Sequence, residues 1–188
     1  MRSKNRDSAN LGARLLNSKV KKLILVNRKD KIKGYCDEEK CHQGKGILHR
    51  AFAIFIFNDK NQLLIQKRSK FKKLWQGYWD NSCSGHPQKG ETYLKAGEKR
   101  LRKEFGFNCH LKFINKFLYQ ASYKDIGSES EICAILVGKY NRNPKPNPKE
   151  IADWKWINFK KLKKEIVKKG QKYTPWFKIA LKKLEKYR

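Results

Sequence analysis

Two uninterrupted apolar runs constrain the fold of this chain more than any other feature. They read "AFAIFIF" at residues 51–57 and "EICAILV" at residues 131–137. Neither run alternates apolar with polar residues, as a strand with one solvent-facing side would, so we expect each to be a strand covered on both faces. Covering both faces of a sheet requires elements packed on each side. The runs therefore favour a layered globular domain and exclude a chain that is disordered throughout.

The remaining patterns predict six more strands and three helices. Further strands are expected at "KLILVN", "KIKGYCD", "QLLIQKR", "WDNSCSG", "CHLKFINKFLYQASY" and "WKWINF". A helix is expected from Thr92 to Phe105, closed by Gly106, and two more near the end of the chain, at 160–170 and after the capping pair Thr174 and Pro175. Residues 38–49, 70–80 and the proline-rich 141–150 are expected to be loops.

Together these elements predict an α/β (α+β) fold, a mixed β-sheet sandwich with flanking helices. We expect a flexible N-terminal segment at 1–20, a single domain at 21–188 and a monomeric protein. No apolar stretch approaches the roughly 20 residues that cross a bilayer, and the five cysteines form no CxxC pair. We therefore expect reduced thiols, a cytoplasmic location and no membrane span.

The charge balance favours anionic partners. Lys and Arg number 46 against 17 Asp and Glu, a formal net charge of +29. Such an excess suits a phosphorylated small molecule, a nucleic acid or an anionic surface. The alternative is a lysine-rich surface that serves only solvation.

Three of the four histidines and two glutamates suggest a metal site. His42, His49 and His86 stand near expected strand or loop ends, and Glu129 and Glu131 lie two residues apart on one strand, so they project from the same face. In a chain this poor in acid the glutamates need a positive partner, either a divalent metal or nearby lysines. Imidazole and carboxylate ligands together suit zinc, manganese or iron.

The segment 85–107, "GHPQKGETYLKAGEKRLRKEFGF", resembles the Nudix box, a glycine-headed loop and helix that holds a metal bound to a diphosphate. The expected residues of that pattern are present at Gly85, Glu91, Leu101, Glu104 and Gly106. Positions where Nudix hydrolases carry arginine and glutamates are occupied by Lys99, Arg100 and Lys103. Without two helix carboxylates the metal cluster that activates water for pyrophosphate cleavage is lost, which makes hydrolysis the weaker interpretation.

This altered box resembles that of the type 1 isopentenyl-diphosphate isomerases, and so do other motifs in the same order from about Lys21 to the C-terminus. They are the two histidines seven residues apart, "RSKFKKLWQGYWDNS", the His86-Pro87 step, the Glu-Xaa-Glu of Glu129 and Glu131, and "TPW". The resemblance implies conversion of isopentenyl diphosphate to dimethylallyl diphosphate. It also implies a zinc or manganese ion held by His42, His49, His86, Glu129 and Glu131, and Mg²⁺ that bridges Glu104 to the substrate diphosphate.

The same resemblance implies roles for other residues. Protonating an unactivated alkene gives a tertiary carbocation, so the reaction needs an acid and a base on opposite faces of the substrate. Glu131 with Tyr119 matches the acid side, and Trp176 could stabilise the cation through its π face, although it could equally be a core residue. The cations expected to bind the diphosphate are Arg68, Lys72 and Arg100.

Two positions depart from the family pattern. Ser84 stands where the family has its reactive cysteine, and the neighbouring Cys83 is expected to face the opposite side of an extended strand. A hydroxyl is a poorer acid or base than a thiol, whose reference pKa is about 8.5. The family often has a lysine four residues before its first histidine, where this chain has Glu38.

Four interpretations follow from these departures. The first is an isomerase slowed by Ser84, and the second is one in which a local bulge brings Cys83 into the site. The third is a diphosphate-binding relative with little activity, and the fourth is a Nudix-type hydrolase of a prenyl or nucleotide diphosphate. A nucleic-acid-binding module would explain the charge and the lysine-flanked aromatics of "KFKKLWQGYW". Because it gives no reason for the histidines and glutamates, we expect a prenyl diphosphate as the partner and no nucleic acid.

Overall fold

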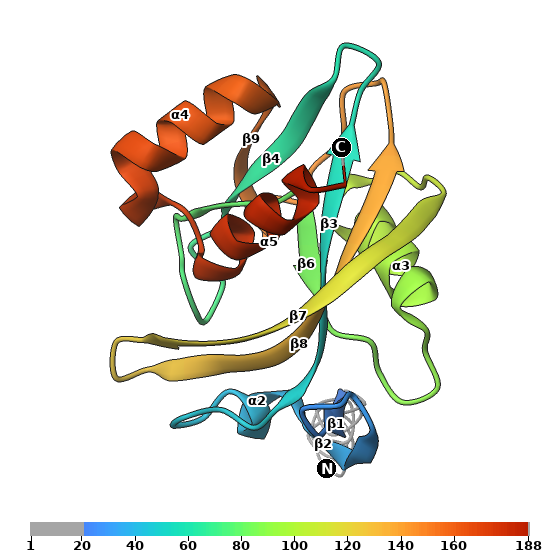
Figure 1. Ribbon diagram of the computed structural model, residues 1–188, viewed down its shortest axis with the longest axis vertical. Coiled ribbons are helices and arrows are strands. Elements are labelled where there is room, and N and C mark those ends of the chain that lie inside the picture. The colour runs from blue at the N-terminus through green and yellow to red at the C-terminus, as the bar shows by residue number, and fades with distance from the viewer. Residues whose placement is uncertain (1–20, 188) are drawn as a thin grey trace, which may run out of the picture.

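The computed structural model describes residues 21–187 and shows one mixed sheet with helices on both faces (Figure 1). The segment expected to be flexible, 1–20, lies outside the described residues. The strands are β1 (Lys22–Val26), β2 (Ile32–Asp37), β3 (His49–Phe57), β4 (Gln62–Arg68), β5 (Trp79–Asp80), β6 (Cys83–Gly85), β7 (Leu111–Tyr123), β8 (Gly127–Lys139) and β9 (Ile151–Asn158). The helices are α2 (Glu38–Cys41), α3 (Tyr93–Phe105), α4 (Phe159–Lys169), the 3₁₀ turn η1 (Gly170–Lys172) and α5 (Pro175–Glu185).

Strand β3 lies at the centre of the sheet. It pairs in parallel with β8 and antiparallel with β1, β4 and β6, while β7 extends the sheet beyond β8 and β9 pairs with β4. This mixed sheet with flanking helices confirms the expected fold class. None of the helices in the described part of the chain is long and apolar enough to cross a membrane.

The two apolar runs are buried on both faces, as their composition predicts. In β3, Phe55 packs in the cluster that contains residues of α4 and α5, whereas Phe52, Ile54 and Ile56 pack in the cluster that contains residues of α3. Figure 1 shows α3 on one side of the sheet and α4 and α5 on the other. Alternation along one strand therefore places large side chains in both cores.

The expected single strand at "WDNSCSG" is wrong in one respect: it is broken into β5 and β6. The break occurs because the side chains of Asn81 and Ser82 replace ladder bonds between strands. Ser82 Oγ accepts from Ile56 N at 2.8 Å and donates to Leu64 O at 2.6 Å, while Asn81 Nδ2 donates to the carbonyl of Cys83 at 2.6 Å. The chain thus crosses from the edge of β4 to the edge of β3.

Two other local expectations also differ from the structure. The stretch 38–49, expected to be a loop, begins with the one-turn helix α2, whose acidic first turn suits a helix N-terminus. Thr174 occupies the N-cap position of α5, but its hydroxyl donates to Asp80 Oδ1 at 2.7 Å and makes no cap hydrogen bond. The Thr174 hydroxyl, which the sequence predicts to cap the helix, is therefore hydrogen-bonded to the buried side chain of Asp80.

Candidate active site

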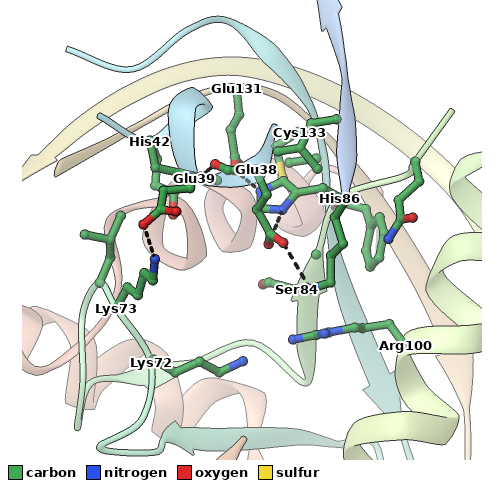
Figure 2. A pocket seen from close by; sticks show the side chains of 18 of the residues that line it. Glu38, Glu39, His42, Lys72, Lys73, Ser84, His86, Arg100, Glu131 and Cys133 are labelled. Carbon is green, nitrogen blue, oxygen red and sulfur yellow. Dashed lines mark hydrogen bonds and ion pairs between the residues drawn. The ribbon is translucent and has the colours of Figure 1, made fainter. Parts of the chain in front are cut away.

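A cavity of about 1160 Å³ opens between α2, β6, α3, the loop 69–78 and the first half of β8. One end carries His42, His86 and the paired glutamates, and the other carries basic side chains (Figure 2). Figure 2 shows Lys72 and Arg100 across the cavity from His86 and Glu131. A space with an acidic, imidazole-rich end and a cationic end suits a small anionic ligand.

The five residues of the predicted metal site come together from four elements. His42 follows α2, His49 begins β3 and His86 follows β6, while Glu129 and Glu131 lie on β8. His49 and Glu131 are register partners in the parallel β3–β8 pair. One ligand atom from each of the five residues lies within 4.8 Å of all the others.

The chemistry of this cluster fits a divalent cation. His49 Nε2 is buried, makes no hydrogen bond and lies 3.6 Å from Glu131 Oε1. Burial and the neighbouring Glu131 carboxylate raise the pKa of Glu129. Burial disfavours the charged imidazole of His86, but the Glu131 and Glu38 carboxylates outweigh that effect and raise its pKa to about 10. Three imidazoles and two buried carboxylates form a donor set typical of zinc, manganese or iron.

Tyr119 joins this cluster from the neighbouring strand. It is the register partner of Glu131 across the β7–β8 pair, and its hydroxyl donates to Glu131 Oε2 at 2.5 Å. The other oxygen of Glu131 lies 2.8 Å from His86 Nε2. Burial and the Glu131 carboxylate raise the pKa of Tyr119 well above its usual value, so the phenol remains a proton donor.

Trp176 lines the cavity from the first turn of α5. Its indole Nε1 is buried without a hydrogen-bond partner among the described residues. The ring meets Trp75 edge-on at 5.0 Å between centroids and lies 6.2 Å from the ring of Tyr119. The indole is thus both packed against the core and part of the cavity wall, so the two interpretations of Trp176 are compatible.

At the cationic end, Glu104 is almost completely buried and surrounded by donors. Its Oε1 lies 2.5 Å from Arg100 Nη2 and 3.4 Å from Lys72 Nζ. Its Oε2 lies 3.3 Å from Cys83 Sγ and from Gln66 Nε2. Burial opposes ionisation, but Arg100 and Lys72 together lower the pKa of Glu104, which is therefore a carboxylate.

Glu150 is an acidic residue at the cationic end of the cavity, and the sequence analysis did not predict its presence there. It accepts hydrogen bonds from Lys72 and Arg100 and lies 3.5 Å from Lys103 Nζ. The only sequence signal was a single acidic residue at the end of the lysine-rich and proline-rich loop 141–150. Its partners come from residues 72–103, and no local pattern encodes that contact.

Arg68 is held by protein groups. Its guanidinium donates to the carbonyls of Leu74 and Trp75 and to the buried Asp80, at 2.9–3.2 Å, and lies 5.3 Å from the Trp176 ring centroid. The side chain fixes the loop 69–78 against the cavity. Asp80, whose other oxygen accepts from Thr174, links this arginine to the start of α5.

Ser84 and Cys83 face opposite sides of β6. Cys83 is fully buried with the residues that pack under α3, and burial raises the pKa of its thiol well above the usual value. Ser84 lines the cavity, and its hydroxyl donates to Asn81 Oδ1 at 3.0 Å. A bulge that would bring Cys83 into the cavity is therefore absent, and the serine is the residue at the site.

The comparisons with known proteins agree with this architecture. The model of the NUDIX domain family matches residues 47–177. Among solved structures, DR0079 from Deinococcus radiodurans has a TM-score of 0.65 at 23% identity and covers 79% of this chain and 90% of its own. The MutT protein from Methanosarcina mazei has a TM-score of 0.62 at 15% identity and covers 74% and 94%. The fold and the matched domain define a protein of the Nudix superfamily.

Curated relatives narrow this class. "Isopentenyl-diphosphate Delta-isomerase 2" of Photorhabdus laumondii is 41% identical over 83% of this chain and 88% of its own length. "Isopentenyl-diphosphate Delta-isomerase" of Serratia proteamaculans is 39% identical over 86% and 90%. Within the Nudix superfamily, the chain belongs to the isopentenyl-diphosphate Delta-isomerase family.

Proposed function

We propose that this protein converts isopentenyl diphosphate to dimethylallyl diphosphate, with a turnover limited by Ser84. The observation that carries the proposal is one cavity with a Tyr119–Glu131 pair at the histidine end and Lys72 and Arg100 at the other. Membership of the isomerase family supports the same substrate. We also propose a monomer in the cytoplasm, a compartment that keeps free cysteines such as these reduced.

The cationic end is proposed to bind the diphosphate. Lys72 Nζ and Arg100 Nη2 supply charged donors that phosphate oxygens accept, the guanidinium with fixed planar geometry. Mg²⁺ that accompanies the diphosphate is proposed to contact Glu104, because that ion prefers one or two carboxylates together with phosphate oxygens. This arrangement fixes the alkene end of a five-carbon substrate toward Glu131.

At the other end, Glu131 and Tyr119 are proposed to protonate the terminal carbon of the double bond. A zinc or manganese ion held by His42, His49, His86, Glu129 and Glu131 would neutralise the buried carboxylates and hold Glu131 in place. The Trp176 indole then faces the tertiary cation and stabilises it by about 2 kcal/mol when water is excluded. Loss of a proton from the adjacent carbon completes the shift of the double bond.

Ser84 is proposed to slow that second proton transfer. Its hydroxyl hydrogen is directed to Asn81 Oδ1, and a neutral hydroxyl is a weak base. General acid or base catalysis contributes about 10²–10⁴-fold to a rate. Ser84→Cys is therefore expected to raise kcat at least about tenfold with little change in KM, because the cations that hold the diphosphate are unaltered.

The test is a product assay with purified protein, isopentenyl diphosphate and Mg²⁺, with and without added Zn²⁺ or Mn²⁺. Three proteins are compared: the parent, Ser84→Cys and the matched control Cys83→Ser. The control exchanges a thiol for a hydroxyl on the buried face of the same strand. Dimethylallyl diphosphate from the parent, and faster formation by Ser84→Cys alone, are the expected results. If neither the parent nor Ser84→Cys forms product and phosphate is released instead, the isomerase proposal fails in favour of hydrolysis.

A further inference from the structure

The three histidines of the proposed metal site differ in the group that contacts the ring nitrogen Nδ1. His42 Nδ1 lies 2.6 Å from the carbonyl oxygen of Glu38, and His49 Nδ1 lies 2.7 Å from that of Ile47. A carbonyl oxygen can only accept, so both Nδ1 atoms carry hydrogen and both Nε2 atoms are free to bind a metal. His86 is different, because its Nδ1 forms an ion pair with a carboxylate, Glu38 Oε1 at 3.7 Å, a distance longer than that of a hydrogen bond.

Glu38 is well placed to contact two of the three imidazoles. It begins α2, and its backbone carbonyl reaches His42 across that single turn. Its carboxylate extends to the His86 ring at the edge of the cavity, where Figure 2 shows the two side by side. The other carboxylate oxygen lies 3.0 Å from Lys21 Nζ, and the backbone N–H of Glu38 donates to the Lys21 carbonyl.

We propose that Glu38 is a positioning residue that orients the imidazole of His86 for metal binding. Carboxylates that accept from the outer nitrogen of a bound histidine fix the tautomer and the ring orientation, and their loss typically costs about 10–100-fold in metal affinity. The proposal rests on the metal site of the proposed function. It assigns a role to the position where the isomerase family often has a lysine, whose charge would disfavour a cation at the same imidazole.

The proposal makes the metal affinity of the protein depend on one partly exposed side chain. Glu38→Ala removes both charge and acceptor, whereas Glu38→Gln removes the charge and keeps an acceptor oxygen. Glu39→Gln is the matched control, because Glu39 lies next along α2 and its carboxylate pairs with Lys73 at 2.7 Å. None of these substitutions alters the backbone carbonyl that holds His42.

The experiment measures Zn²⁺ binding to metal-free protein by competition with a chromogenic chelator, without substrate. Glu38→Ala is expected to raise the Kd for Zn²⁺ about 10–100-fold, Glu38→Gln by less, and Glu39→Gln not at all. A change in the visible absorption spectrum of the Co²⁺-loaded protein, in Glu38 variants only, is the accompanying expectation. Thermal unfolding of the metal-free variants reports that each is folded.

Equal Zn²⁺ affinity in the parent and all three variants would overturn the proposal, as would the absence of Zn²⁺ binding by the parent. These outcomes are separate from those of the isomerase assay. A parent that forms no dimethylallyl diphosphate, but whose Zn²⁺ affinity falls in Glu38→Ala, would leave Glu38 as a positioning residue and remove the proposed reaction. Product formation by the parent, together with unchanged Zn²⁺ affinities in the variants, would support the proposed reaction and remove the proposed role of Glu38.

Discussion

The carboxylate of Glu150 contacts the cations that we propose to bind the diphosphate. It accepts hydrogen bonds from Lys72 and Arg100, the same side chains that lie against Glu104. The side chain is 15% exposed, so these contacts are only partly screened by water. A bound diphosphate must therefore share these donors with a resident anion.

Glu150→Gln is expected to tighten binding of inorganic pyrophosphate several-fold. The substitution keeps the size of the side chain but removes one negative charge from a cluster of three cations, which increases attraction for an anion. Calorimetric titration of pyrophosphate with Mg²⁺ measures the change. Glu165→Gln, which breaks an ion pair to Lys155 outside the cavity, is the control and is expected to leave the affinity unchanged. Weaker binding by Glu150→Gln would mean that the carboxylate holds the cations in place for the ligand.

The same variant tests a pH effect. Burial alone would raise the pKa of Glu150, but Arg100 and Lys72 outweigh it and lower the pKa to about 2 from its usual 4.5. A carboxyl group whose pKa is lower in the folded state contributes stability above pH 4.5, and this contribution is lost as the pH falls from 4.5 toward 2. Glu150→Gln should therefore show a smaller loss of unfolding free energy over that interval.

At individual positions, the sequence predicts those features that depend on residues adjacent in the chain. The opposite orientation of Cys83 and Ser84 follows from the alternation of side chains along a strand. Asp80 links Arg68 to Thr174, which are 106 positions apart in the chain. No motif in the sequence predicts this contact. The proposed role of Glu38 likewise depends on His86, whose position follows from the pairing of β6 with β3.

At the scale of elements, the junction between α2 and β8 positions the first histidine. Strand β8 begins at Gly127, two residues before Glu129, and the N–H of Ser128 donates to the carbonyl of His42 at 2.9 Å. A Cβ on Gly127 would lie 2.5 Å from that carbonyl oxygen. The glycine therefore permits the close approach of the two backbones.

Gly127→Ala is expected to destabilise the protein by about 1–3 kcal/mol, because the overlap is with backbone and cannot be relieved by a change of rotamer. Denaturant unfolding of the metal-free protein measures the effect. Gly170→Ala is the matched control, since no atom lies within 4 Å of the added methyl group and its backbone is helical, and it is expected to change stability by less than about 1 kcal/mol. Equal stability of both variants would show that α2 moves freely relative to β8.

Elements with strong local signals were predicted well. Helix α3 begins after Thr92, whose side chain accepts from the N–H of Lys95, and ends at Gly106 with a left-handed φ of 71°. Each cap depends on one residue, the side-chain oxygen of Thr92 and the backbone freedom of Gly106, so it can be read from the sequence. The division into β5 and β6 was missed because it depends on hydrogen bonds from Asn81 and Ser82 to strands β3 and β4, which a reading of the local pattern does not contain.

At the scale of the whole molecule, the five proposed metal ligands connect segments that span residues 42–131. They join α2 to β3, β6 and β8, so a bound ion would link both the centre of the sheet and its short edge strand. An unfolded chain presents no such preformed set, which means that metal binding is coupled to global stability.

Zn²⁺ is therefore expected to stabilise the folded protein against heat. At a free concentration of 100 times its Kd, an ion that binds only the native state adds about 2.7 kcal/mol, equivalent to roughly 5–10 °C in Tm for a domain of this size. His86→Ala should lose most of this increase, whereas His110→Ala, which removes the one histidine outside the cluster, should retain it. Differential scanning calorimetry with and without chelator measures all three proteins. An equal increase in His86→Ala would contradict this prediction, because the stabilising ion would then not depend on the imidazole that connects β6 to β8.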